Sequence, residues 1–191
     1  MCRATPRQTE GPFYPVDDQL DKDTDLTWVE GRSERATGQI IYVEGVVMDP
    51  NCQPIEGALV EIWQACESGR YNHPGDRENP APLDPNFQYW GRALSDREGK
   101  YLFKTIVPGS YPAGPDWIRP SHIHFKIQKR GFLELITQMY FAGDPLNDKD
   151  LILQRLSQEN QRSVIVELNE PTSDHEPGSK VCRFNITLRR A

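Results

Sequence analysis

Two histidines separated by one residue form the most suggestive chemical pattern in this chain of 191 residues. The apolar residues around His122 and His124 alternate with polar ones, as in a half-buried β-strand, at Ile123, Phe125 and Ile127. Side chains two residues apart on a strand share one face with their bases roughly 6.6 Å apart, so both imidazoles can converge on one metal ion. Such a pair also fits two satisfied or exposed histidines, and a metal site needs further ligands.

Tyrosine completes such a site better than the remaining histidines do. His73 lies in a loop and His175 in a polar stretch, without a strand or a matching carboxylate, so a three-histidine zinc or cupin-like site is poorly supported. A phenolate is a hard anionic donor that suits ferric iron. Tyr71 and Tyr111 each end a strand-like run, where functional side chains are often displayed, although packing in a turn is the alternative. Three other tyrosines lie within strand-like runs and are expected to pack with their hydroxyl groups at an edge: Tyr42, Tyr101 and Tyr140.

The segments that position these residues predict a mainly β fold. Short runs rich in β-branched and aromatic residues recur between turn residues, at 40–43, 46–48, 58–65, 100–106, 120–128, 164–168 and 181–188. One helix is expected over residues 148–159, with Asn147 as its N-cap. This pattern favours a β-sandwich of mixed and antiparallel strands with long loops and one short helix.

The chain is expected to form a single domain with two parts. Residues 1–38, rich in Pro, Asp, Thr and Arg, predict an extended N-terminal arm, and residues 39–191 predict the β-sandwich that carries the candidate ligands. A chain of this length can bury a core without disulfides or structural zinc. The proline-rich loop over residues 74–89 is a candidate substrate lid.

Composition favours a small-molecule partner. A net charge of -6 and a pI near 5.3 offer no basic surface for a phosphate backbone, so nucleic acid is not expected. No apolar run approaches the roughly 20 residues of a membrane span, and the N-terminus lacks a signal core, which predicts a cytoplasmic protein. A Met directly before Cys2 would also arise if a leader had been trimmed, so an exported or lipoprotein form is the alternative.

The four cysteines have no CxxC spacing, and most are expected to be ordinary thiols: Cys2, Cys52, Cys66 and Cys182.

Taken together, these segments resemble those of the intradiol ring-cleavage dioxygenases, particularly the protocatechuate 3,4-dioxygenase group, over nearly the whole chain. The matching segments are residues 60–65, 69–71, 81–87, 111–112, 119–125 and 136–141. Residues 5–14 also resemble family N-termini, including a segment that lines the pocket from the partner chain in two-subunit relatives. One departure follows Pro112, where the protocatechuate enzymes usually have a tryptophan and this chain reaches Trp117 only after residues 113–116. The pocket wall is expected to differ there.

The resemblance implies one non-haem ferric ion, Fe(III), per chain, with four ligands: Tyr71, Tyr111, His122 and His124. It also implies that Arg119 stabilises negative charge on the activated ring, that Gln138 is a polar active-site residue and that Tyr111 is a displaceable ligand and base. The implied reaction is intradiol cleavage of a catechol by O2 to a muconate-type diacid, in aromatic hydrocarbon catabolism. The short arm leaves no room for the helical N-terminal region of the catechol and hydroxyquinol branches, which favours a protocatechuate-like substrate.

Two alternative interpretations stay open. Residues 46–49, 54–58 and 96–101 also resemble transthyretin-like or carboxypeptidase-regulatory-like β-sandwich modules, which are often structural or adhesive. Such a module would not require Arg119 together with all four candidate ligands. A noncatalytic partner subunit is the second alternative, although relatives of that kind have lost metal ligands that are present here. The oligomeric state, whether homo-oligomer or hetero-oligomer, is left open.

Overall fold

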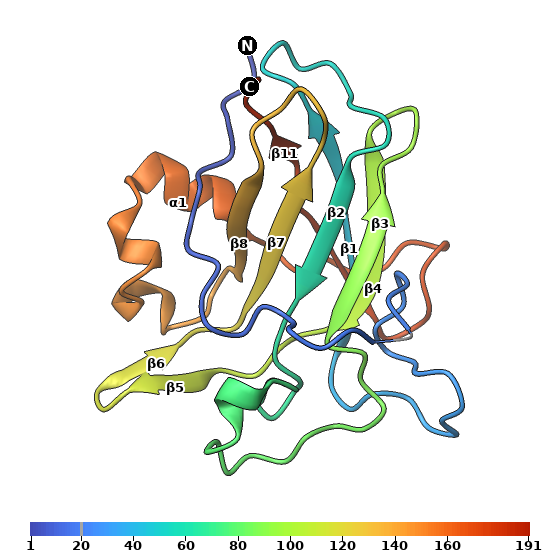
Figure 1. Cartoon of the computed structure of the whole chain (residues 1–191), viewed down its shortest axis with the longest axis vertical. Helices are drawn as coiled ribbons and strands as arrows, with labels where there is room; N and C mark the ends of the chain where they lie inside the picture. Colours follow the sequence, from blue (N-terminus) through green and yellow to red (C-terminus); the bar gives the residue numbers. More distant parts are fainter. Residues whose placement is uncertain (20) are drawn as a thin grey trace.

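Alternating apolar residues organise the first of two large sheets in the computed structural model, which describes residues 1–19 and 21–191 (Figure 1). Burial alternates residue by residue along β1 (Ile40–Met48), because side chains on a strand point to opposite faces in turn. β1 pairs in antiparallel with β4 (Lys100–Ile106). It pairs in parallel with β10 (Lys180–Arg183) and β11 (Ile186–Thr187).

The second sheet contains the predicted histidine strand. Its strands, in spatial order, are β3 (Trp90–Leu94), β2 (Leu59–Trp63), β7 (His122–Gln128), β8 (Leu135–Phe141) and β9 (Ile165–Val166). Only β9 pairs in parallel, with β8. A separate hairpin of β5 (Tyr111–Gly114) and β6 (Trp117–Arg119) projects from one end of the sandwich (Figure 1).

Aromatic side chains join the two sheets across the core. The ring of Phe125 on β7 lies 6.3 Å from that of Tyr101 on β4 and 4.9 Å from that of Phe184. Tyr101 is buried and donates its hydroxyl proton to the Phe184 carbonyl, so the expectation that its hydroxyl lies at an edge is wrong. Gly45 allows this close packing, since a Cβ there would lie 2.0 Å from the Phe184 carbonyl oxygen.

The helix predicted over residues 148–159 is replaced by shorter pieces. These are two 3-10 helices and one α-helix: η2 (Asn147–Lys149), η3 (Leu153–Arg155) and α1 (Gln158–Val164). Asp150 interrupts the run because its backbone is extended and its carboxylate accepts the Leu153 N–H. Ser157 then caps α1 with its side chain, as expected for a residue that favours helix ends. The mainly β fold with one short α-helix is confirmed.

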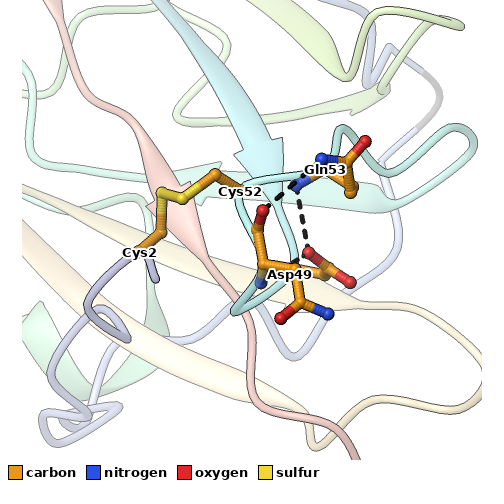
Figure 2. Close-up of a disulfide and its surroundings, with 5 residues drawn as sticks. Cys2, Asp49, Cys52 and Gln53 are labelled. Carbon is orange, nitrogen blue, oxygen red and sulfur yellow. Dashed lines mark hydrogen bonds between the residues drawn. A yellow bond between two sulfur atoms is a disulfide. The ribbon is translucent and has the colours of Figure 1, made fainter.

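A disulfide between Cys2 and Cys52 fixes the beginning of the chain. The expectation that most cysteines are ordinary thiols is therefore corrected for these two. Cys2 is bonded to Cys52, with Cα atoms 5.2 Å apart, whereas Cys66 and Cys182 are free and buried. Figure 2 shows that Cys52 lies in the turn after β1, where the Asp49 side chain accepts the Gln53 N–H. The pairing spans 50 residues and depends on spatial proximity, which cysteine spacing does not reveal.

The first residues run along the outer side of the second sheet (Figure 1). Backbone N–H groups of Thr5 and Gln8 donate to the carbonyls of Thr187 and Ile136. The division into an arm over residues 1–38 and a sandwich over 39–191 stays a prediction. Within residues 1–19 and 21–191, the structure contains no helix with the length and apolarity that spanning a bilayer requires.

Candidate metal centre

His122 and His124 lie on the face of β7 opposite the apolar core, as the alternating pattern predicted. Both are almost completely buried. The strand register places Tyr140 of β8 beside His122, and it places Gln138 of β8 and Trp63 of β2 beside His124. The Trp63 ring stacks on the His124 imidazole with centroids 4.8 Å apart and an interplanar angle of 10°, which restricts the rotation of this imidazole.

Tyr71 and Tyr111 come together because two chain segments approach closely at a glycine. Gly69 has φ +84°, and a Cβ there would lie 2.2 Å from the Ser110 carbonyl oxygen, so only glycine fits without rearrangement. Asp76 accepts the Tyr71 backbone N–H at 2.7 Å and fixes the chain beyond this contact. The two phenol rings meet edge to face with centroids 5.3 Å apart, and both are buried.

The four predicted ligand side chains therefore gather in one place. The rings of His122 and His124 are 4.9 Å apart, the Tyr111 ring is 5.6 Å from His122 and the Tyr71 ring is 6.2 Å from His124. The Tyr111 hydroxyl oxygen lies 3.4 Å from Nε2 of His122. Nδ1 of His122 donates to the Pro120 carbonyl at 2.7 Å, which leaves Nε2 as the unprotonated nitrogen facing Tyr111.

Burial keeps all four side chains uncharged when no cation is present. Burial, reinforced by the nearby charge of Arg119, holds the pKa of both histidines well below its usual value. Burial, followed by the neighbouring Tyr111, raises the pKa of Tyr71 far above its usual range. It raises the pKa of Tyr111 as well, although Arg119 opposes that change. Neutral imidazoles are the form in which histidine binds metals.

These side chains fit a bound ferric ion. The Tyr71 hydroxyl and Nδ1 of His124 are buried without a hydrogen-bond partner among the described residues, and unpaired buried polar atoms are costly. A metal ion beside Tyr71 would satisfy its oxygen by coordination. The described part of the chain contains no group of three or more His, Cys, Asp or Glu side chains that could hold a metal, so the mixed tyrosine and histidine set is the candidate.

Arg119 lies next to this cluster in a buried polar network. The register of the β5–β6 hairpin places it opposite Tyr111. Its Nη2 donates to Oε1 of Gln138 at 2.7 Å and to the Tyr140 hydroxyl at 3.1 Å. Its Nε donates to Oδ1 of Asp150 at 2.8 Å.

Two members of this network were not predicted from the sequence. Asp150 lay inside a predicted helix, and Tyr140 was expected to pack with its hydroxyl at an edge, whereas both are completely buried. Strand periodicity offered a signal for Tyr140, because it lies two residues after Gln138 and therefore shares its face of β8. No comparable sequence signal identified Asp150.

Residues 8–13 of this same chain cover the centre. Gln8 donates to the Gln138 carbonyl at 2.8 Å and accepts from the Tyr140 hydroxyl at 3.0 Å. Phe13 stacks on Tyr71 with ring centroids 4.6 Å apart. The N-terminal segment thus covers the centre of its own chain.

A cavity of about 430 Å³ opens beside the centre, and its lining includes Gly11, Pro12, Phe13, Tyr111, Arg119 and His124. A second cavity of about 400 Å³ is lined by Tyr71, Arg70 and His73, and Phe13 also borders it. Tyr111 and His124 are therefore the predicted ligands that face the first cavity, which has room for a single aromatic ring.

Comparisons with known proteins agree with this picture. The family model described as Dioxygenase matches residues 9–190. The protocatechuate 3,4-dioxygenase beta chain of Burkholderia cepacia is 40% identical over 186 residues, covering 96% of this chain and 78% of that protein. Catechol 1,2-dioxygenase 2 of Acinetobacter lwoffii is 35% identical over 161 residues, covering 74% of this chain and 52% of that protein. The chain thus spans about half of that catechol enzyme.

Solved dioxygenase structures also resemble this chain. The dioxygenase domain of a fusion with a carbohydrate-binding protein, from Streptomyces sp. SirexAA-E, superposes with a TM-score of 0.73 at 27% identity, covering 99% of this chain and 100% of that chain. An intradiol ring-cleavage dioxygenase from Tetranychus urticae gives a TM-score of 0.73 at 25% identity, covering 98% and 95%. These matches favour an enzyme over a transthyretin-like module. The chain belongs to the intradiol ring-cleavage dioxygenase family and is close to its protocatechuate group.

Proposed function

We propose that this protein cleaves catechol-type diols between their two hydroxyl-bearing carbons, with dioxygen as oxidant and ferric iron as cofactor. The observation that carries the proposal is the convergence of two phenols and two neutral imidazoles next to a buried arginine and an open cavity. Both atoms of dioxygen would enter the product, a muconate-type dicarboxylic acid. Family membership supports the same reaction class.

Four side chains would hold one iron ion per chain: Tyr71, Tyr111, His122 and His124. Two neutral nitrogen donors and two phenolate oxygens suit a hard trivalent cation and offset two of its three charges. Ferric iron, when bound, would supply the Lewis acidity that favours loss of the diol's hydroxyl protons, and a deprotonated diol is electron-rich and reactive toward dioxygen.

Tyr111 is the ligand best placed to act as a base. It lines the cavity, whereas Tyr71 lies behind it under the Phe13 ring. An incoming diol must lose its hydroxyl protons, and the Tyr111 oxygen would accept one as this residue moves away from its place in the centre.

Arg119 would act as a fixed positive charge. Its guanidinium is buried and lines the cavity opposite Tyr111 in the hairpin, so it can stabilise negative charge on the ring oxygens without solvent rearrangement. Gln138 would act through Arg119, since its Oε1 accepts from Nη2 at 2.7 Å. Gln138 would thus orient the cation rather than contact the diol.

The direct test measures iron content, visible absorption and oxygen uptake with purified protein. We expect about one ferric ion per chain, a visible band from phenolate coordination, and consumption of catechol and oxygen in equal amounts. The double variant His122→Ala and His124→Ala, prepared in parallel, should lose all three properties. A wild-type protein that binds no iron and consumes no diol would favour a noncatalytic partner subunit instead.

Other expectations stay predictions. A protocatechuate-like substrate is the expectation that follows from the sequence resemblance. One relative is named a beta chain, which supports an assembly of several chains. Cytoplasmic location is the sequence-based expectation, but the Cys2–Cys52 disulfide favours the exported alternative, because disulfides persist mainly in oxidising compartments.

A further inference from the structure

We propose that the enzyme prefers catechols whose ring carries no negatively charged substituent, and that Glu78 determines this preference. The proposal rests on the proposed function, since it takes the cavity beside Tyr111 as the diol site. It differs from the protocatechuate-like substrate that the sequence suggested, because protocatechuate carries a carboxylate on its ring.

The charged residues around the cavity are mostly acidic. Among the described residues that line it, Asp76 and Glu78 are carboxylates and Arg119 is the sole permanent cation. The Arg119 charge is offset by the buried carboxylate of Asp150, to which both Nε and Nη2 donate. Arg119 therefore does not leave a full positive charge for a second anion.

Burial shows which charges a ring substituent would meet. Tyr111, His124 and Arg119 are buried and form the floor of the cavity, while Glu78 is exposed and lies at its rim. A diol bound by its oxygens at the floor would direct a substituent on the opposite side of the ring toward the rim. A carboxylate in that position would approach Glu78, and like charges repel.

The rest of the lining offers little compensation for a buried anion. Apolar groups dominate it, from Pro12, Phe13, Pro112, Ala113, Trp117 and Ile152. A carboxylate that loses water against such groups without a partner is strongly disfavoured. The basic side chains of Arg70 and Arg77 border the second cavity, beyond the Phe13 ring, rather than this one. A neutral substituent would bury its surface without this electrostatic cost.

The test compares 3,4-dihydroxybenzoate with its methyl ester, which has the same ring and nearly the same shape but no charge. With the iron-loaded enzyme, we expect kcat/KM for the ester to exceed that for the acid by about tenfold or more. The reason is that water and salt only partly screen the repulsion between the substrate carboxylate and Glu78. Glu78→Lys should raise the acid-to-ester ratio about tenfold. Glu98→Lys makes the same charge change on an exposed turn outside the cavity lining and should leave the ratio unchanged.

Two results would overturn the proposal: a wild-type enzyme that uses the acid as well as the ester, or equal ratios in the Glu78 and Glu98 variants. Failure of the proposed function has a different signature, because then neither compound nor catechol itself is consumed. In that case calorimetric titration of both compounds still compares their binding. Tighter binding of the ester supports the charge preference, and equal or weaker binding rejects it.

Discussion

Arg119 and Asp150 form a buried ion pair in which Nε and Nη2 of Arg119 donate to the two carboxylate oxygens at 2.8 and 3.2 Å. The pair joins the β5–β6 hairpin to the segment between η2 and η3. Asp150 also accepts from the Trp117 indole and from the Leu153 backbone N–H, so its position is fixed from three directions. The orientation of Arg119 toward the proposed metal centre thus depends on a residue that lines no part of the cavity.

Asp150→Asn should reduce turnover while leaving the proposed iron centre intact. The amide keeps one acceptor but removes the charge that holds the guanidinium, so we expect kcat to fall about tenfold to a hundredfold with little change in KM. Breaking a buried ion pair on one side costs about 3–5 kcal/mol, so Asp150→Ala should lower the free energy of unfolding by that amount. Kinetics, visible spectra and urea denaturation measure these effects. The control Asp148→Asn changes an exposed neighbour, and equal behaviour of the Asp148 and Asp150 variants would reject the positioning role.

Replacing either proposed ligand tyrosine, Tyr71 or Tyr111, should change the colour of the protein. Tyr71→Phe removes a buried oxygen without a hydrogen-bond partner, so we expect a large loss of iron content. Tyr111→Phe removes the proposed base that faces the cavity, so turnover should fall by about a hundredfold or more even when iron is supplied in excess. Iron analysis and visible spectroscopy distinguish the two effects. Tyr42→Phe, on β1 beside His175, is the matched control and should resemble the wild type.

The sequence predicted the parts of this centre that follow from local periodicity and from family motifs. Alternation around Ile123 indicated that His122 and His124 share a face, and the register of β7 with β2 and β8 agrees with it. Asp150 could not be predicted, because its pairing with Arg119 joins segments 31 residues apart and interrupts a run that has helical spacing. The Cys2–Cys52 bond is likewise a product of tertiary contact rather than of local pattern.

Glu176 provides a pH-dependent contribution to stability away from the cavity. Its carboxylate lies 2.5 Å from the Lys104 ammonium and 3.0 Å from the Arg35 guanidinium. The hydrogen bond from Lys104 holds the pKa of Glu176 below its usual value of 4.5. A lowered pKa in the folded state stabilises the protein above the unfolded pKa, and this contribution is lost as the pH falls through the folded value.

Glu176→Gln should therefore destabilise the protein at neutral pH by about 1 kcal/mol, a value limited by solvent screening of this partly exposed group. The difference from wild type should shrink as the pH falls below 4.5. Urea denaturation at pH 7 and pH 3.5 measures both values. Glu170→Gln, which removes a more exposed partner of Lys180, should have a smaller effect at pH 7. A Glu176→Gln difference that is constant with pH would contradict the assignment.

The disulfide and the side-chain contacts of the arm should affect different properties. The Cys2–Cys52 bond closes a loop with a sequence separation of 50, so Cys2→Ser should lower the free energy of unfolding by about 2–4 kcal/mol. Turnover should change little at 25 °C, since Thr5 and Gln8 still anchor the arm through backbone hydrogen bonds.

Gln8→Ala should lower turnover more than it lowers stability, the reverse of Cys2→Ser. It leaves the disulfide in place but removes bonds to the Tyr140 hydroxyl and the Gln138 carbonyl, which orient the partners of Arg119, so kcat should fall about tenfold. Thermal melting and steady-state kinetics on both variants, with and without a thiol reductant, separate the two roles. If Cys2→Ser lost as much turnover as Gln8→Ala, the disulfide would be needed to hold the arm over the proposed metal centre. The backbone hydrogen bonds of Thr5 and Gln8 would then be insufficient.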